Sequence, residues 1–360
     1  MRCLCSVSSK SRKDPFIGIG AGGYLLVALK QYETGINLQK LDDLERERIM
    51  PFIKAAKLEP LFDTKKVLEV AQQRWLALKP LIYQDLDGWS EEDSNLITYL
   101  MGAPGVLALA AQLYYYLNDV AEFKKIIATI QDTIVKWVKK LNEGGAVAYE
   151  LLYGVPGFIY TLLDLQIRFQ YNKSVTDEFK IDFEKEVVDL VLMLMDEVDP
   201  ESNGIIFQPN QWRLFCTFFN TEYFGAAHGT FGLCYIILAA YKLNKKPFDD
   251  LGDVTKDMLT KLEKSYKSLV ALQLPSGNFP IHSKSPQDDK LVQWCHGSPG
   301  AIPSLLLASE VLANPELKQS LFESALKAGE NVWKFGALKK GFNLCHGILG
   351  NAMAFLSIYK

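Results

Sequence analysis

A four-residue pattern, Gly-x-x-Gly, recurs along this chain at the head of apolar segments, and it restricts the folds that the chain can adopt. The first glycines of its six copies are Gly20, Gly102, Gly154, Gly229, Gly297 and Gly347. Each copy precedes an apolar run of helical length, as in Val106 to Leu117. Such repetition is typical of a fold built from repeated helical units. Because glycine lacks a side chain, we expect loop backbones to crowd together at one end of these helices.

The segments between the copies have the pattern of amphipathic helices. Val120 to Leu141 carries isoleucines three and four residues apart, with charged residues between them, which gives one apolar stripe. Phe179 to Val198 and Val254 to Leu274 follow the same pattern. Helices that are apolar nearly all round thus alternate with helices that are apolar on one side. We predict an all-α fold, a closed repeat of helix pairs with an inner ring of buried helices and an outer ring that faces water.

Strands and loops are expected in few places. No clean period-two alternation persists between turn residues, so the sequence predicts little β structure. Clusters of proline, glycine, serine and acidic residues predict loops at Asp199 to Gly204, Pro275 to Pro280 and Ser283 to Asp289.

Charge and hydropathy exclude several functional classes. The 360 residues carry a formal net charge of -3 without a long block of like charges, so neither nucleic acid nor an anionic membrane surface is indicated as a partner. The longest apolar runs are shorter than the roughly 20 residues that span a bilayer. We therefore expect no transmembrane segment, and leave peripheral membrane contact open.

The start of the chain differs from the rest. Met1 to Lys13 is short, basic and rich in serine, and it has no apolar signal-peptide core. We predict a flexible segment at 1–13, one domain over 14–360 and a cytoplasmic location. Cys3 and Cys5 lie in this segment with no adjoining hydrophobic helix, which disfavours their acylation.

Histidines and cysteines gather in the last three copies of the pattern. Three of the four histidines lie in His-Gly pairs there, and two of these follow a cysteine. Thiolates and imidazoles are preferred zinc ligands, and a catalytic zinc takes three protein ligands and keeps one open position. If adjacent repeats lie side by side, Cys295, His296, Cys345 and His346 become neighbours and favour one zinc ion. The alternative is that Cys295 and Cys345 are packed as small apolar residues.

The remaining histidines and cysteines have simpler interpretations. His228 has no cysteine neighbour, so it is a candidate general acid or base, with a purely structural role as the alternative. His282 is interpreted as a surface or loop residue. Cys216 and Cys234 lie in apolar, helix-like sequence and are expected to be packing residues.

With these motifs, the chain resembles the LanC-like family, the eukaryotic relatives of bacterial lanthionine synthetase C cyclases. The resemblance covers nearly the whole chain and is strongest from about Glu222 onward. It rests on Leu152-Tyr-Gly154, Gly225-Ala-Ala-His-Gly229, Pro275-Ser-Gly-Asn-Phe-Pro280, Trp294-Cys-His-Gly-Ser-Pro-Gly300 and Lys339-Lys-Gly-Phe-Asn-Leu-Cys-His-Gly347. It implies a double α/α toroid of seven inner and seven outer helices, of which this chain would lack the seventh pair at its C-terminus.

The resemblance also assigns roles to individual residues. By the family's motifs Cys295, Cys345 and His346 look like the ligands of one zinc ion, which places His296 beside the metal. The counterpart of His228 is the family's proposed acid or base. The second lysine before the last Cys-His-Gly, here Lys340, helps to hold glutathione.

The implied function is a glutathione transferase. Glutathione would be the co-substrate, and its zinc-activated thiolate would add to dehydroalanine or dehydrobutyrine residues of proteins or peptides. His228 or His296 would protonate the α-carbon. The alternative is a non-catalytic scaffold or regulator that binds zinc and glutathione. A toroidal glycosidase or terpenoid cyclase is disfavoured, because Glu150 has no second acid in register.

Overall fold

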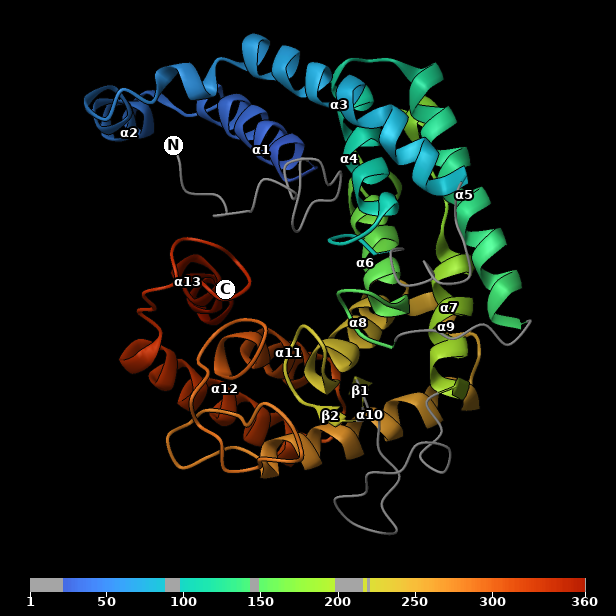
Figure 1. The fold of residues 1–360 in the computed structure, drawn as a ribbon, viewed down its shortest axis with the longest axis vertical. Helices are drawn as coiled ribbons and strands as arrows, with labels where there is room; N and C mark the ends of the chain where they lie inside the picture. The colour runs from blue at the N-terminus through green and yellow to red at the C-terminus, as the bar shows by residue number, and fades with distance from the viewer. Residues whose placement is uncertain (1–21, 88–97, 143–148, 198–215, 219–220, 360) are drawn as a thin grey trace. The chain divides into compact units, whose positions relative to one another are not determined.

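The computed structural model describes residues 22–87, 98–142, 149–197, 216–218 and 221–359, and these are mostly helical (Figure 1). The chain forms two compact units. Of the described residues, unit 1 holds 149–163, 182–197, 216–218 and 221–359, and unit 2 holds 22–87, 98–142 and 164–181. The prediction of an all-α fold is confirmed. The single domain expected over 14–360 stays a prediction.

Unit 2 is a group of helices around the apolar helix α4. Its elements are α1 (Gly22–Gln39), α2 (Asp43–Ala55), α3 (Thr64–Asp87), α4 (Ala103–Tyr116), α5 (Val120–Asn142), the short 3-10 turns Glu59–Phe62 and Asp177–Phe179, and the π-helical turn Gln166–Gln170. Helix α4 packs on α1, α3 and α5. Every residue from Ala103 to Tyr114 is buried, whereas α5 buries one stripe that includes Ile126, Ile130 and Ile134. The predicted alternation of helix types is therefore present here.

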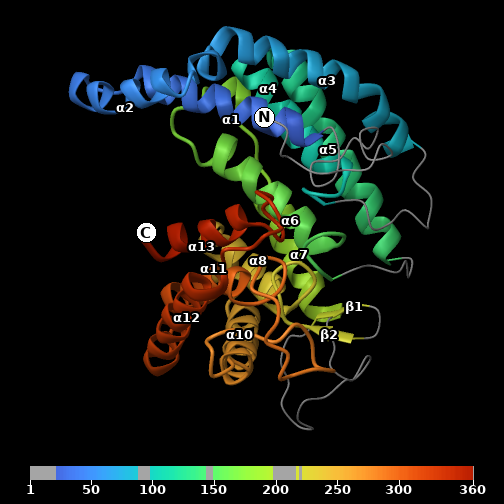
Figure 2. The ribbon, with the colours of Figure 1, turned by 60° about the vertical axis from the view of Figure 1, so that its left-hand side comes forward.

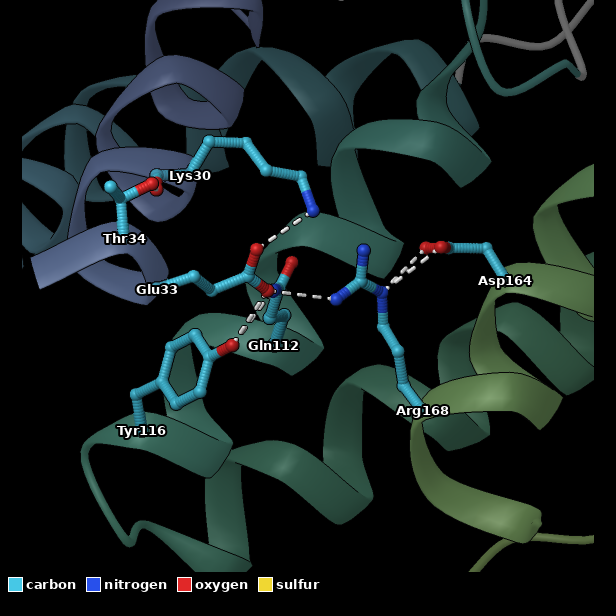
Figure 3. Close-up of polar contacts among 7 residues, drawn as sticks. All are labelled: Lys30, Glu33, Thr34, Gln112, Tyr116, Asp164 and Arg168. Carbon is cyan, nitrogen blue, oxygen red and sulfur yellow. Dashed lines mark hydrogen bonds and ion pairs between the residues drawn. The ribbon is translucent and has the colours of Figure 1, made fainter. Parts of the chain in front are cut away.

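A polar network joins three segments of unit 2 (Figure 3). The Glu33 carboxylate of α1 accepts hydrogen bonds from Tyr116 Oη at 2.8 Å and from Arg168 Nη1 at 3.0 Å. Gln112 of α4 donates to the same oxygen. Arg168 also donates from Nε to both oxygens of Asp164 at 3.0 Å. The network thus fixes α1 and α4 to the segment 164–181.

Unit 1 contains the other helices and one small sheet. Its elements are α6 (Val155–Leu165, of which the last two residues belong to unit 2), α7 (Glu184–Glu197), β1 (Cys216–Phe218), β2 (Thr221–Tyr223), α8 (Thr230–Leu243), α9 (Lys245–Asp249), α10 (Asp253–Ala271), α11 (Ser298–Val311), α12 (Pro315–Phe335) and α13 (Ile348–Tyr359). Helix α11 packs on α8, α12 and α13. Figures 1 and 2 both show α12 and α13 side by side.

Five of the six glycine patterns lie at helix starts. Gly102, Gly229 and Gly297 are the N-cap residues of α4, α8 and α11, and α6 and α13 begin directly after Gly154 and Gly347. Gly20 of the first copy lies outside the described residues.

Steric crowding explains why the second position of the pattern is glycine. A Cβ there would collide with the carbonyl oxygen of the residue six positions earlier. The separations would be 1.8 Å between Gly105 and Tyr99, 2.0 Å between Gly232 and Ala226, 2.0 Å between Gly300 and Trp294, and 1.8 Å between Gly350 and Leu344. The loop before each inner helix therefore folds back onto the first turn of that helix. This is the crowding that the sequence predicted.

The structure differs from the sequence prediction at two elements. Cys216 was expected in a helix, but it lies in β1, opposite Tyr223 of the antiparallel partner β2. The aromatic and β-branched residues of these segments favour such pairing. Helix α7 begins at Glu184, later than predicted, because Asp177–Phe179 forms a 3-10 turn and the Asp182 side chain accepts the Glu184 N–H at 3.0 Å. Cys234 is buried in α8, as predicted.

The remaining predictions concern the loops, the start of the chain and membrane-spanning helices. The predicted loops at 275–280 and 283–289 contain no helix and no strand. The segment 1–13, with Cys3 and Cys5, and the predicted loop at 199–204 lie outside the described residues. Among the helices of the described ranges, none has both the length and the apolar character needed to cross a membrane.

Candidate metal and acid–base site

Cys295 lies in a tight turn directly before α11. Gln293 and His296 exchange two backbone hydrogen bonds, each of 3.1 Å, so Trp294 and Cys295 form the tip of the turn. Gly297 then adopts a φ of 101°, a left-handed conformation that favours glycine. This irregular backbone separates the directions of the adjacent Cys295 and His296 side chains.

Two buried asparagines hold this turn in place. Asn278, from the predicted loop at 275–280, accepts the Ser298 N–H at 2.9 Å and donates to Leu291 O at 3.1 Å. Asn351 of α13 donates to Val292 O at 2.8 Å. Because both side chains are buried, these bonds are well protected from water, and the turn is supported from both sides.

Cys345 and His346 come from the loop before α13. The Cys295 N–H donates to Cys345 O at 3.1 Å, which joins the two cysteine segments directly. The His346 N–H donates to Asn343 Oδ1 at 2.8 Å. As a result the ligand atoms of Cys295, Cys345 and His346 all lie within 4.8 Å of one another, and His296 is not part of this group.

The two thiols of the group influence each other's ionisation. A hydrogen bond from the Cys345 thiol lowers the pKa of Cys295 against the opposing effect of burial, and Gln293 Nε2 contributes by donating to its sulfur at 3.2 Å. The same hydrogen bond, together with burial, raises the pKa of Cys345. Cys295 is therefore the thiol that ionises first.

The donor set fits a zinc ion. Zinc binds cysteine sulfur at about 2.3 Å and histidine nitrogen at about 2.0 Å, so ligand atoms around one ion are separated by about 3.5 to 4 Å. The ligand atoms of Cys295, Cys345 and His346 lie up to 4.8 Å apart, which approaches that range. The lowered pKa of Cys295 already favours one thiolate. Three protein ligands of this kind leave one coordination position for another molecule.

Gln293 connects this group to Lys340. Its Nε2 donates to Cys295, and its Oε1 accepts from Lys340 Nζ at 3.1 Å. The Gln293 side chain is buried, while Lys340 is exposed. The sequence did not single out Gln293, because its role depends on contacts with both the Cys295 turn and the Lys340 loop.

His228 has a buried carboxylate as its partner. Its Nδ1 lies 2.8 Å from Glu150 Oε2, and a carboxylate only accepts, so Nδ1 carries the proton. Glu150 also accepts backbone N–H groups of Leu152, at 3.0 Å, and Tyr153. Any acid–base chemistry of this ring would therefore use Nε2. The sequence singled out both residues but not their pairing.

Aromatic rings surround His228. Tyr153 stacks on it with ring centroids 5.9 Å apart, and the His296 ring lies at 6.0 Å. Tyr223 contacts His228, His296 and also His282, whose ring centroid lies 5.4 Å away. His282 is in a loop as predicted, but it is half-buried against this cluster.

The acid–base pair and the sulfur group form one site. The Ala227 N–H donates to Cys295 O at 3.4 Å, and the Leu151 N–H donates to Ala227 O at 3.2 Å. A Cβ at Gly225 would lie 2.2 Å from Cys295 O, so this close approach requires glycine. Unit 1 therefore brings together all the residues singled out from the sequence. The set is Cys295, Cys345, His346, His228, His296 and Lys340.

Burial determines the protonation state of His296. It lowers the pKa of this imidazole to about 4, and the charges of His228 and His282 act in the same direction. In the metal-free protein His296 is therefore neutral at neutral pH.

Comparison with known proteins gives consistent matches. The family model described as "Lanthionine synthetase C-like protein" matches residues 51–360. The chain is 34% identical to "Glutathione S-transferase LANCL1" of Danio rerio over 271 residues, 73% of this chain and 59% of that protein. It is 30% identical to "LanC-like protein GCL1" of Arabidopsis thaliana over 272 residues, 73% of this chain and 55% of that protein. The chain thus spans less than two thirds of the length of these relatives.

A solved structure supports the fold class. The chain is similar to "Nisin cyclase" with a TM-score of 0.59 and 16% sequence identity, over 96% of this chain and 76% of that one. Nisin cyclase is a LanC-type helical toroid. The predicted α/α toroid class is therefore confirmed.

Proposed function

This chain belongs to the lanthionine synthetase C-like family, and from that premise we propose that it catalyses zinc-dependent addition of glutathione to dehydroalanine or dehydrobutyrine residues of proteins or peptides. The observation that carries the proposal is the group of Cys295, Cys345 and His346 beside the His228–Glu150 pair. The name of the Danio rerio relative, a glutathione S-transferase, supports glutathione as co-substrate. The nisin cyclase neighbour supports a peptide as acceptor.

Three residues would hold the zinc ion. Cys295, Cys345 and His346 supply two sulfurs and one nitrogen, and the fourth position stays open. Bound zinc lowers the pKa of a thiol ligand, which is the chemistry that it would supply here. Gln293 would keep the Cys295 sulfur oriented through its hydrogen bond of 3.2 Å.

His228 would deliver the proton. When the glutathione sulfur bonds to the β-carbon, the electron pair of the carbon–carbon double bond moves onto the α-carbon and its carbonyl. Protonated His228 can pass its Nε2 proton to that carbon, because Glu150 already holds the Nδ1 proton at 2.8 Å. His296 has no comparable support, since its buried Nδ1 has no hydrogen-bond partner among the described residues. We therefore assign the proton transfer to His228.

Lys340 would bind a carboxylate of glutathione. Its ammonium group is exposed, and it is held 3.1 Å from Gln293 Oε1. Charge-assisted hydrogen bonds to carboxylates are strong. The same glutamine that contacts the Cys295 sulfur would thus also position the cation that receives the tripeptide.

Metal content and product formation test the proposal together. Purified wild type is expected to hold one zinc per chain and to add glutathione to a dehydroalanine peptide, as seen by mass spectrometry. Cys345→Ala should lose most of the metal and the product, while Cys234→Ala, which changes a buried cysteine outside the group, should keep both. Wild type without stoichiometric zinc would refute the site. Bound zinc without any product would favour the non-catalytic scaffold.

A further inference from the structure

Tyr153 occupies the position in its glycine pattern that histidine occupies in the later copies. It directly precedes Gly154, the first glycine of the third copy. The residues that directly precede the first glycine of the last three copies are His228, His296 and His346. All three of these histidines belong to the site described above. Tyr153 is therefore a candidate for a role in the same chemistry.

Glu150 holds Tyr153 and His228 in a fixed relation to each other. Its carboxylate is buried, and Oε2 lies 2.8 Å from His228 Nδ1. The other oxygen, Oε1, accepts the backbone N–H of Tyr153. The two rings stack almost parallel, at 14°, with centroids 5.9 Å apart, which is within the usual range for aromatic pairs. One buried carboxylate thus fixes the imidazole directly and the tyrosine through its backbone.

The phenol of Tyr153 lies between the acid–base pair and the sulfur group. Burial is the main cause that raises its pKa, and the negative charges of Glu150 and Cys345 act in the same direction. The phenol therefore keeps its proton at neutral pH and remains a hydrogen-bond donor. The two charges that act on it belong to the two halves of the site.

The proposed reaction needs a hydrogen-bond donor at the carbonyl group of the acceptor residue. When the sulfur bonds to the β-carbon and the carbon–carbon π bond breaks, negative charge spreads over the α-carbon and the carbonyl oxygen. This oxygen lies about 2.4 Å from the α-carbon, as the lengths of the two intervening bonds require. Its donor must therefore lie next to the acid that protonates the α-carbon. Fixed donors at such an oxygen, tyrosine among them, lower the barrier strongly.

Tyr223 is the other phenol beside His228, and its ring is placed differently. It lies 5.4 Å from the His282 ring and 5.8 Å from the His296 ring. Its distance to the His228 ring is larger, at 6.4 Å, and these two rings are inclined at 67°. Tyr153 is thus the phenol that stacks on the assigned proton donor.

We propose that Tyr153 is a further catalytic residue, whose O–H donates a hydrogen bond to the carbonyl oxygen of the dehydroamino acid while negative charge develops there. The phenol keeps its own proton throughout. The proton that the α-carbon gains comes from His228 Nε2, as assigned above. This inference rests on the proposed function, since it concerns the same reaction.

Tyr153→Phe tests the role of the hydroxyl, because it keeps the ring that stacks on His228 and removes the O–H. Loss of one such donor typically lowers the rate about 10²- to 10³-fold. The turnover number for glutathione addition to a dehydroalanine peptide should fall by that factor. The KM for glutathione should stay within about threefold of wild type. Zinc content and melting temperature should not change, because the three grouped ligands are intact.

The matched control is Tyr241→Phe, which removes a phenol hydroxyl near the C-terminal end of α8. That hydroxyl donates to Asp249 Oδ1 at 3.2 Å, so its loss should leave the turnover number within about twofold of wild type. An active wild type with an equally active Tyr153→Phe would overturn the role of Tyr153 alone. Loss of zinc in Tyr153→Phe, or equal losses of activity in both variants, would also overturn that role. A wild type that forms no product would refute the proposed function and this inference together.

Discussion

Glu150 of unit 1 and Glu33 of unit 2 are both enclosed glutamates that accept several hydrogen bonds, but their donors differ in kind. Glu33 is bound by Lys30 at 2.8 Å and Arg168 at 3.0 Å, which are permanently charged, and by Tyr116. Glu150 is bound by two backbone N–H groups and by the imidazole of His228.

The difference separates a structural network from the pair to which we assign the proposed proton transfer. Burial alone would raise the pKa of Glu33, but hydrogen bonds from Lys30 and Tyr116 and the charges of Lys30 and Arg168 hold it below the ordinary value. The Glu33 carboxylate is held by ion pairs with Lys30 and Arg168 (Figure 3). The partner of Glu150, in contrast, is the imidazole of His228, a type of group that can act as a general acid or base. We therefore assign the proposed chemistry to the buried Glu150 with its imidazole partner, and a structural role to the partly buried Glu33 with its cations.

The largest expected effect comes from removing the proton donor of the reactive pair. General acid catalysis contributes about 10²- to 10⁴-fold in rate, so His228→Ala should lower the turnover number for glutathione addition by about that factor. Its zinc content should stay at the wild-type level, because His228 is not among the three grouped ligands. Steady-state kinetics and metal analysis on the same preparation check both values. Loss of zinc, or a change in rate below about threefold, would contradict the assigned role.

A smaller effect is expected from removing the central cation of the structural network. Arg168→Ala leaves Asp164 without its partner and Glu33 with one cation fewer. Breaking a largely buried ion pair costs about 2–4 kcal/mol, which for a chain of this length corresponds to a melting temperature lower by about 3–5 °C.

An exposed pair provides the control for that experiment. Lys242→Ala breaks the Lys242–Glu310 bridge, whose side chains are 49% and 60% exposed, so it should leave the melting temperature nearly unchanged. Equal changes in melting temperature for Lys242→Ala and Arg168→Ala would show that the network of unit 2 stabilises the fold no more than an exposed ion pair does.

The smallest effect is a pH dependence of stability. A carboxyl group whose pKa is lowered by folding stabilises the folded state above its unfolded pKa, and this stabilisation is lost as the pH falls through the folded pKa. Since the folded pKa of Glu33 is lowered, wild type should lose more unfolding free energy than Glu33→Gln when the pH falls from neutral into the acidic range. Urea denaturation at both pH values measures this. Equal losses of unfolding free energy in wild type and Glu33→Gln would contradict the lowered pKa of Glu33.

Features that depend on nearby sequence could be predicted. The glycine patterns predicted five of the observed helix starts, and at four of them the second glycine meets a carbonyl only six residues away, as Gly232 meets Ala226. The grouping of Cys295 and Cys345 also followed from the repeat, since equivalent helix starts come to lie side by side. The choice of His346 over His296 came from the family resemblance. The turn from Gln293 to His296 supplies its physical reason.

Features that depend on distant side chains could not be predicted. Glu150 and His228 are 78 residues apart, and Glu33 and Arg168 are 135 apart. Each pairing requires several loops or helices to be placed first, and a single sequence gives no distance between them. The role of Gln293 could not be predicted for the same reason, because it contacts Cys295 in its own turn and Lys340 in a distant loop. Local propensity also failed at Cys216, where pairing with β2 determines the strand.

We infer that Glu150 serves the proposed reaction and that Glu33 serves the fold. The most direct measurement is the turnover number of Glu150→Gln and Glu33→Gln in the same glutathione-addition assay with the same dehydroalanine peptide. Loss of a charged partner that orients a reactive group typically lowers activity about 10- to 100-fold, so Glu150→Gln should fall by that factor while Glu33→Gln stays within about twofold of wild type. Equal losses in both variants, or full activity in Glu150→Gln, would contradict the account.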